Sequence, residues 1–189
     1  DLTELQKDAY KKFGFSPKET LNIMQRLYED HKVLTYPRTD SRYISSDIVP
    51  TIKDRLGACA VGPYRKLAAK VMRVQVSPKA SFVNDKKVSD HHAIIPTEQY
   101  VELTHMTNEE RKIYDLVVRR FLAVLYPPTE YEEIQLTASV GREDFTAKGK
   151  HMLKEGWREV YDSDQEEEED AEEDVRSQAL PKLEKGSRI

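Results

Sequence analysis

The residue types best suited to chemistry lie close together at positions 34–41, where the sequence reads LTYPRTDS. A tyrosine hydroxyl has an ordinary pKa of about 10, so Tyr36 is a weak nucleophile unless a cation stabilises its phenolate. Arg38 and Asp40 follow at two-residue intervals, and in an extended segment alternate side chains point to one side. A guanidinium there can stabilise a phenolate and hold a phosphate oxygen through two hydrogen bonds. The spacing indicates a tyrosine nucleophile beside a phosphate clamp, with Asp40 either orienting Arg38 or beginning the next turn.

A second candidate cluster occupies positions 90–97 and reads DHHAIIPT. Adjacent histidines in an extended segment point to opposite sides, so His91 and His92 do not readily chelate one metal ion. The sequence has no HExxH spacing, and its single cysteine, Cys59, excludes a cysteine zinc cage or an internal disulfide. We expect one histidine to be structural and the other to face a ligand, and we expect no metal site in this chain.

Basic residues elsewhere, together with the aromatic rings of Tyr36, Tyr43 and Phe82, could line a groove for a nucleic-acid backbone and its bases. Plainer interpretations stay open on spacing alone. Tyr36 can be a packed ring beside a solvated arginine, Thr39–Ser41 can be a helix cap, and the basic residues can be an ordinary solvated surface. The basic candidates are Arg42, Arg55, Arg65, Lys66, Lys70, Arg73, Lys86, Lys87, Arg111, Arg119 and Arg120.

The charge of the chain is distributed unevenly along its 189 residues, although the net charge is only −4. Ten of the 34 acidic residues lie within 162–174, which contains no basic residue. The remainder carries 30 basic against 24 acidic side chains, a net charge of +6. No apolar run approaches the roughly 20 residues that cross a bilayer, so no membrane partner is expected. The chain begins at Asp1, and we expect it to be a piece of a longer protein from a reducing compartment.

Helices are expected to position these candidates. Ser16 and Glu19 form a capping-box pattern around Pro17, which predicts a helix to about Glu29. An extended stretch at 33–36 then ends at Pro37. Further helices are predicted from Ser45 or Ser46 to Gly57 or Gly62, from Pro63 onward, and from the capping box at 107–110 to Pro127–Pro128.

After Pro128 the hydrophobic period changes from helical to two. Strands are predicted at 134–140, at 145–148 after a turn at 141–144, at 157–161 and, beyond the acidic run, at 180–183. The acidic run is too charged to pack and is expected to be disordered. The fold class is therefore α+β, a mostly helical block followed by a β-rich block.

The first cluster, LTYPRTDS, resembles the active-site signature of the type IA DNA topoisomerases, and DHHAIIPT resembles a second signature of the same family. Residues 5–10 and 13–16 resemble the family's approach to the first helix of its tyrosine domain. The proline after Tyr36 and the paired histidines are most similar to the bacterial topoisomerase III branch. The resemblance implies a helical, winged-helix-like tyrosine domain at 15–126, inserted into a β-rich arch, or gate, domain. Residues 1–14 and 127–189 would be parts of that arch, with a disordered acidic loop at about 162–178.

The resemblance also implies a reaction. Tyr36 would attack a phosphodiester of single-stranded DNA, forming a 5′-phosphotyrosine link, and the free 3′-hydroxyl would later reseal the strand without ATP. Arg38 would be catalytic and would steady the scissile phosphate. His91 would contact a DNA phosphate, and Asp40 joins the DNA-binding set. The expected location is the bacterial cytoplasm, in association with the nucleoid.

In this family Mg²⁺ and the general acid belong to an N-terminal Toprim domain, which nothing in this sequence resembles. The chain is therefore expected to need the Toprim and remaining domains as partners, and to fold but not relax DNA alone. Its oligomeric state stays open. Three alternatives remain: a tyrosine recombinase, which leaves a 3′-phosphotyrosine; a non-catalytic winged-helix-like DNA-binding module; and an interaction fragment that docks through the acidic run. Tyr36 precedes His91 and most arginines, which argues against the recombinase.

Overall fold

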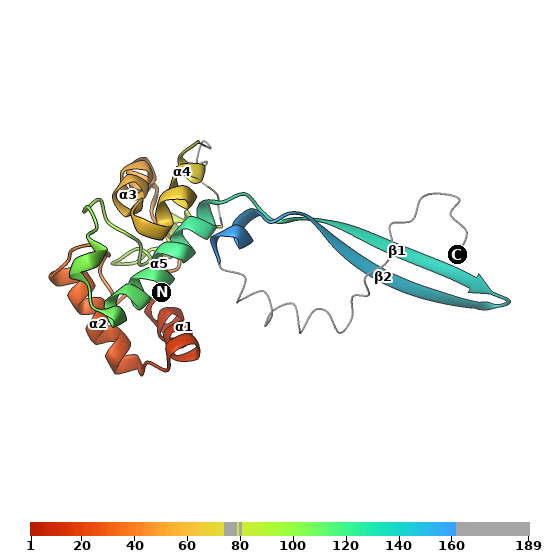
Figure 1. Cartoon of the computed structure of the whole chain (residues 1–189), viewed down its shortest axis with the longest axis horizontal. Coiled ribbons are helices and arrows are strands. Elements are labelled where there is room, and N and C mark those ends of the chain that lie inside the picture. Colours follow the sequence, from red (N-terminus) through yellow and green to blue (C-terminus); the bar gives the residue numbers. More distant parts are fainter. Residues whose placement is uncertain (74–78, 80, 162–189) are drawn as a thin grey trace. The chain divides into compact units, whose positions relative to one another are not determined.

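A computed structural model describes residues 1–73, 79 and 81–161 of the chain (Figure 1). It divides into two compact units, Asp1–Tyr126 and Pro127–Ile189. The described part of the first unit is helical, and that of the second contains a two-stranded antiparallel sheet, so the α+β prediction is confirmed. The winged-helix likeness and the arch assignment stay predictions. No helix in the described part of the chain is both long and apolar enough to cross a membrane.

The first unit is built around its longest helix. That helix, α5, contacts α1, α2 and α4, and α3 packs on α4; Figure 1 shows α5 between the α1–α2 pair and α3–α4. The core between them is apolar, with Leu27, Ile113, Val118 and Leu122 all buried. The bounds are α1 Leu2–Phe13, α2 Pro17–Glu29, α3 Ile52–Cys59, α4 Arg65–Arg73 and α5 Asn108–Leu125.

Both predicted capping boxes are confirmed. The Ser16 side chain accepts from the Glu19 backbone N–H, and the Glu19 carboxylate accepts from the backbone N–H of Ser16. Thr107 and Glu110 make the same reciprocal pair at the start of α5. These bonds satisfy backbone donors that a helix start otherwise leaves unpaired. Because the pattern involves only residues three positions apart, the sequence predicts both helix starts.

The helix predicted from Ser45 or Ser46 is wrong at both ends. A 3₁₀ turn, η1 (Ser46–Thr51), comes first, and α3 begins only at Ile52, because Pro50 has no N–H for an α-helical hydrogen bond. Gly57 lies inside α3 rather than ending it. The Pro63 start is delayed similarly by η2 (Gly62–Tyr64), and α4 follows.

Residues 2–13, expected to contribute to a β-rich arch, form helix α1 instead and pack against α2 and α5. Asp1 caps this helix by accepting from the Glu4 backbone N–H at 2.8 Å. Gly14 ends it with φ +73°, a left-handed conformation that glycine adopts without a steric penalty. Whether this stretch belongs to an arch domain in a longer protein stays a prediction.

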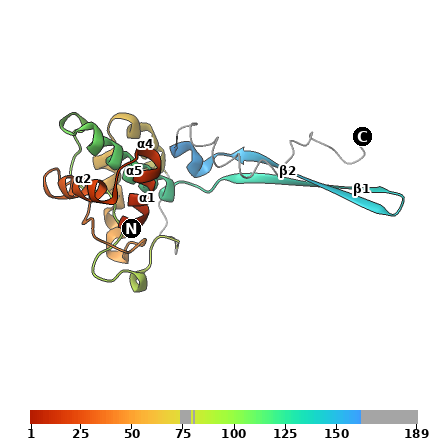
Figure 2. The same ribbon diagram turned by 90° about the horizontal axis from the view of Figure 1, so that it is seen from below.

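The second unit contains a long hairpin of β1 (Glu130–Val140) and β2 (Glu143–Lys154), which run side by side in both views (Figures 1 and 2). The return strand is longer than the predicted 145–148. The strand predicted at 157–161 is wrong: residues 156–160 form a 3₁₀ turn, η5 (Gly156–Val160). Gly156 has φ +55°, and a Cβ there would collide with the Pro128 carbonyl, so the chain turns tightly where the strand was expected. The acidic run and the strand predicted at 180–183 lie outside the described residues.

Candidate functional site

The structure brings the two sequence motifs together as a short antiparallel pair. Leu34 bridges Pro96, and the flanking hydrogen bonds run from the Thr35 N–H to the Ile95 carbonyl and from the Thr97 N–H to the Val33 carbonyl, both at 3.0 Å. Leu34 and Pro96 are fully buried. The segment that carries Tyr36 is thus extended, as predicted, and is held against the histidine motif.

The Tyr36 ring lies between two other rings. The edge-on contact with Tyr28 of α2 has a centroid distance of 5.6 Å and an interplanar angle of 83°. The His91 ring is closer, at 4.2 Å with a tilt of 36°. Tyr36 itself is half-buried, so its ring is fixed from two sides while the side chain keeps access to solvent.

Two threonine hydroxyls fasten the motifs to each other. Thr35 Oγ1 accepts from the Ile95 N–H at 3.0 Å. Thr39 Oγ1 donates to the His91 carbonyl at 3.0 Å and accepts from the Ser41 N–H at 3.1 Å. Thr39 is only 6% exposed, so its hydroxyl is occupied by the backbone. It holds the position of His91 and is not available to a ligand.

Arg38 and Asp40 are exposed on the same segment. Among the described residues, neither side chain forms a hydrogen bond or an ion pair, so the structure does not bear out the idea that Asp40 orients Arg38. His91 is exposed as well. The structure therefore pairs Tyr36 with His91 and leaves the charged ends of Arg38 and Asp40 open to a ligand.

Upstream of the segment, a buried carboxylate secures the end of α2. Glu110 of α5 accepts from Arg26 Nε at 2.7 Å and lies 3.2 Å from His31 Nε2. Desolvation, the largest effect on this group, raises its pKa, but the hydrogen bonds from Arg26, Thr107 and His31 together hold the pKa of Glu110 below its ordinary value. Sequence reasoning recognised Glu110 as a cap and missed this second role, which needs partners about 80 positions away.

The structure divides the basic candidates into paired and unpaired groups. Arg42 is exposed but pairs with Asp1 at 2.7 Å and Glu4 at 3.2 Å, and Arg55 is buried. Arg119 pairs with an aspartate one turn away, and Arg120 contacts Asp8. Four exposed residues make no side-chain hydrogen bond, ion pair or ring contact with any described residue and remain candidates for phosphate contacts: Arg65, Lys66, Arg73 and Lys86.

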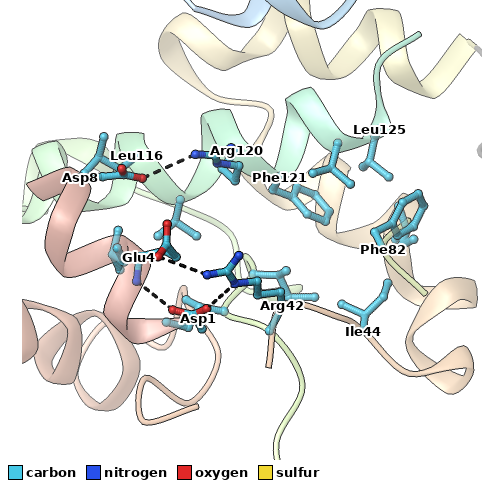
Figure 3. Close-up of a pocket in the computed structure, with 17 residues that line it drawn as sticks. Asp1, Glu4, Asp8, Arg42, Ile44, Phe82, Leu116, Arg120, Phe121 and Leu125 are labelled. Atoms are coloured by element: carbon cyan, nitrogen blue, oxygen red, sulfur yellow. Dashed lines mark hydrogen bonds and ion pairs between the residues drawn. The ribbon is translucent and has the colours of Figure 1, made fainter. Parts of the chain in front are cut away.

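A pocket of about 290 Å³ lies in the helical unit (Figure 3). Phe82 and Phe121 line its apolar side, and two ion pairs to α1 border it, Arg42 with Glu4 and Arg120 with Asp8. None of Tyr36, Arg38, Asp40 or His91 lines it. Within residues 1–73, 79 and 81–161, no group of three His, Cys, Asp or Glu side chains converges as a metal site would require. The candidate site is therefore an exposed surface around Tyr36 and not this pocket.

Comparison with known proteins gives a consistent result. The family model for DNA topoisomerase matches residues 1–189. The whole chain is 62% identical to part of the DNA topoisomerase 3 of Bacillus cereus and of Bacillus anthracis, and 55% identical to part of that of Bacillus subtilis. In each case the chain spans 26% of the relative's length.

Proposed function

Because this chain belongs to the type IA DNA topoisomerase family and its relatives are bacterial topoisomerases III, we propose that it carries the nucleophile of such an enzyme. The enzyme cleaves and reseals single-stranded DNA in the bacterial cytoplasm, relaxing or decatenating DNA without ATP. The observation that carries the proposal is the half-buried Tyr36 ring, stacked on His91 at 4.2 Å where two paired motifs meet. Arg38 and Asp40, exposed and without partners among the described residues, complete the surface.

In the proposed cleavage step the Tyr36 oxygen attacks the scissile phosphorus. The new O–P bond forms as the P–O3′ bond breaks, the tyrosine loses its proton, and the departing 3′-oxygen gains one. Arg38 binds the non-bridging phosphate oxygens, where negative charge gathers in the transition state. His91 contacts a neighbouring phosphate, and Asp40 contributes to DNA binding. Resealing is the reverse reaction, so the energy of the broken phosphodiester is kept in the phosphotyrosine bond.

Mg²⁺ and the proton donor to the 3′-oxygen are assigned to the Toprim domain elsewhere in the longer protein. The described residues of this chain do not fit a metal: no three of their His, Cys, Asp and Glu side chains converge. We therefore derive no step through Mg²⁺ from these residues.

The decisive experiment uses the full-length protein, as wild type and as Tyr36→Phe. Each is incubated with Mg²⁺ and single-stranded DNA labelled at either end, and is then denatured. We expect a covalent adduct on the 5′ side of the break in the wild type and none in Tyr36→Phe, with DNA binding retained in both. An adduct on the 3′ side would move the protein to the recombinases. Binding without any adduct would leave a non-catalytic DNA-binding module.

The isolated 189-residue chain is expected to be inactive, because phosphoryl transfer without its metal ion and acid loses most of its electrostatic stabilisation. The test is agarose-gel analysis of supercoiled plasmid incubated with the purified chain and Mg²⁺, beside the full-length protein as a positive control. Relaxation by the 189-residue chain itself would contradict this expectation.

A further inference from the structure

The strand at 95–97 pairs with the extended segment at 33–36, called here the tyrosine segment. Its hydrogen bonding is unusual on the side that faces away from the tyrosine segment. In the antiparallel bridge of Leu34 with Pro96, the neighbouring residues make the hydrogen bonds, so the Pro96 carbonyl points away from the tyrosine segment. Proline has no N–H, so this edge position carries an acceptor and no donor. Pro96 is fully buried, and its carbonyl therefore needs a partner from the protein.

That partner is Arg55 of α3. Its Nη1 donates to the Pro96 carbonyl at 2.8 Å, the position that a neighbouring strand would otherwise fill. Its Nε donates to Thr51 Oγ1 at 2.8 Å, and its Nη2 pairs with Glu98 Oε1 at 2.9 Å. All three nitrogens of the guanidinium are engaged although the residue is only 6% exposed.

A buried arginine is a costly way to fill a core, because its charge must be removed from water. Desolvation lowers the pKa of Arg55, and the charge of Glu98 opposes that change. An apolar side chain would avoid this cost but would leave the Pro96 carbonyl unpaired. The planar guanidinium instead fixes the direction of its bonds, and so the position of the strand they hold.

We propose that Arg55 is a positioning residue for cleavage: it fixes the strand at 95–97 and, through that strand, the placement of Tyr36 against His91. The strand bonds directly to Val33 and Thr35, beside Tyr36, and His91 lies four residues before it in the chain. The inference rests on the proposed function, because it concerns the same nucleophile. Arg55 touches neither Tyr36 nor the DNA in this scheme and acts only through the backbone.

The test is the time course of covalent adduct formation by full-length protein on saturating single-stranded DNA. Arg55→Met keeps an unbranched apolar side chain and removes the guanidinium donors, and Arg55→Lys keeps one charged donor. Arg111→Met is the matched control, since Arg111 also donates to a backbone carbonyl, that of Met106 at 3.2 Å, outside the tyrosine segment. A misfolded fraction lowers the amplitude of adduct formation, whereas a misplaced nucleophile lowers its rate constant.

We expect Arg55→Met to lower the rate constant by about ten- to a hundredfold, since small misplacements of reacting groups cost that much. The affinity for DNA should change by less than about twofold. Arg55→Lys should recover part of the rate, and Arg111→Met should keep the wild-type rate constant at saturating DNA whatever its affinity for DNA. A wild-type rate constant in Arg55→Met, with or without reduced amplitude, overturns the proposal. If Arg55→Met does not fold, a wild-type rate constant in Arg55→Lys overturns it. If the wild type forms no Tyr36-dependent adduct, the proposed function itself fails.

Discussion

Tyrosine side chains in the helical unit have very different surroundings. Tyr64 and Tyr114 are buried with ring centroids 6.0 Å apart, and burial raises the pKa of both hydroxyls. These two hydroxyls therefore stay neutral and are not accessible to a substrate. Tyr36 is half-buried beside an exposed arginine, so of these three tyrosines it is the one whose surroundings suit the proposed nucleophile.

The same two buried tyrosines give a stability prediction. The Tyr64 hydroxyl donates to Asp115 at 3.0 Å, while the Tyr114 hydroxyl has no hydrogen-bond partner among the described residues. Tyr64→Phe should lower the free energy of unfolding by roughly 1–2 kcal/mol, because a bond to a carboxylate is lost. Tyr114→Phe should leave it unchanged or raise it by up to about 1 kcal/mol, because an unsatisfied polar group is removed.

Urea unfolding of the 189-residue chain, followed by circular dichroism, measures both changes. Each variant serves as the control for the other, since both delete one hydroxyl from a buried ring of the same type. If the two variants lose the same free energy of unfolding, the Tyr114 hydroxyl must have a hydrogen-bond partner.

Helices α2 and α5 are joined where Glu110 meets Arg26 and His31. The same carboxylate accepts from the Thr107 backbone N–H at 2.9 Å, so one group both caps α5 and holds the end of α2. The chain then passes through Lys32, with φ +58°, into the extended segment before Tyr36. This contact between α2 and α5 therefore fixes the point from which the chain enters the tyrosine segment.

Glu110 also makes the stability of the helical unit depend on pH. Its pKa in the folded state lies below its ordinary value of 4.5, so its stabilisation is complete above that value and is lost as pH falls through the lowered folded pKa. Glu110→Gln should cost roughly 2–4 kcal/mol at pH 7, and the difference from wild type should shrink as pH falls below about 4.5.

Urea unfolding at a series of pH values from 7 down to 3 tests this expectation. The exposed neighbour Glu109 provides the control, since Glu109→Gln should have a much smaller effect. A difference between wild type and Glu110→Gln that stays constant across the series would contradict the assigned pKa direction.

At the scale of the whole chain, we expect the uneven distribution of charge to affect the affinity for DNA. Deleting 162–174 changes the net charge from −4 to +6, because ten acidic and no basic residues are removed. DNA binding by the full-length protein should become stronger by roughly three- to tenfold at about 50 mM salt, and the gain should shrink as salt screens the repulsion.

Fluorescence anisotropy with labelled single-stranded DNA, titrated at several salt concentrations, measures the effect. A variant with residues 162–174 scrambled keeps the charge and should bind like the wild type. The scrambled variant keeps the charge of residues 162–174, so an equal change in DNA affinity in both variants would show that the order of these residues matters and not their charge. If deletion abolishes a protein partner's binding, the run is a docking segment.

Local signals account for the parts of the fold that could be predicted. The capping boxes at Ser16 and Thr107 and the period-two pattern before Val140 each act between residues a few positions apart. The errors arose where two local signals competed: Pro50 delayed a helix behind a 3₁₀ turn, and Gly156 turned the chain where alternation suggested a strand.

By itself the sequence determined the α+β class, the starts of α2 and α5 and, through its two motifs, Tyr36 with Arg38, Asp40 and His91 as candidates. The class and the helix starts need only residue type and short spacing, whereas the choice of His91 and the roles of these four residues came from the resemblance to a known family. Only the tertiary structure decided that Tyr36 stacks on His91, that Thr39 is occupied by the backbone, and that Arg55 is buried against Pro96. These contacts join residues some 40 to 55 positions apart, and their formation depends on burial and on backbone hydrogen bonds that no local pattern records.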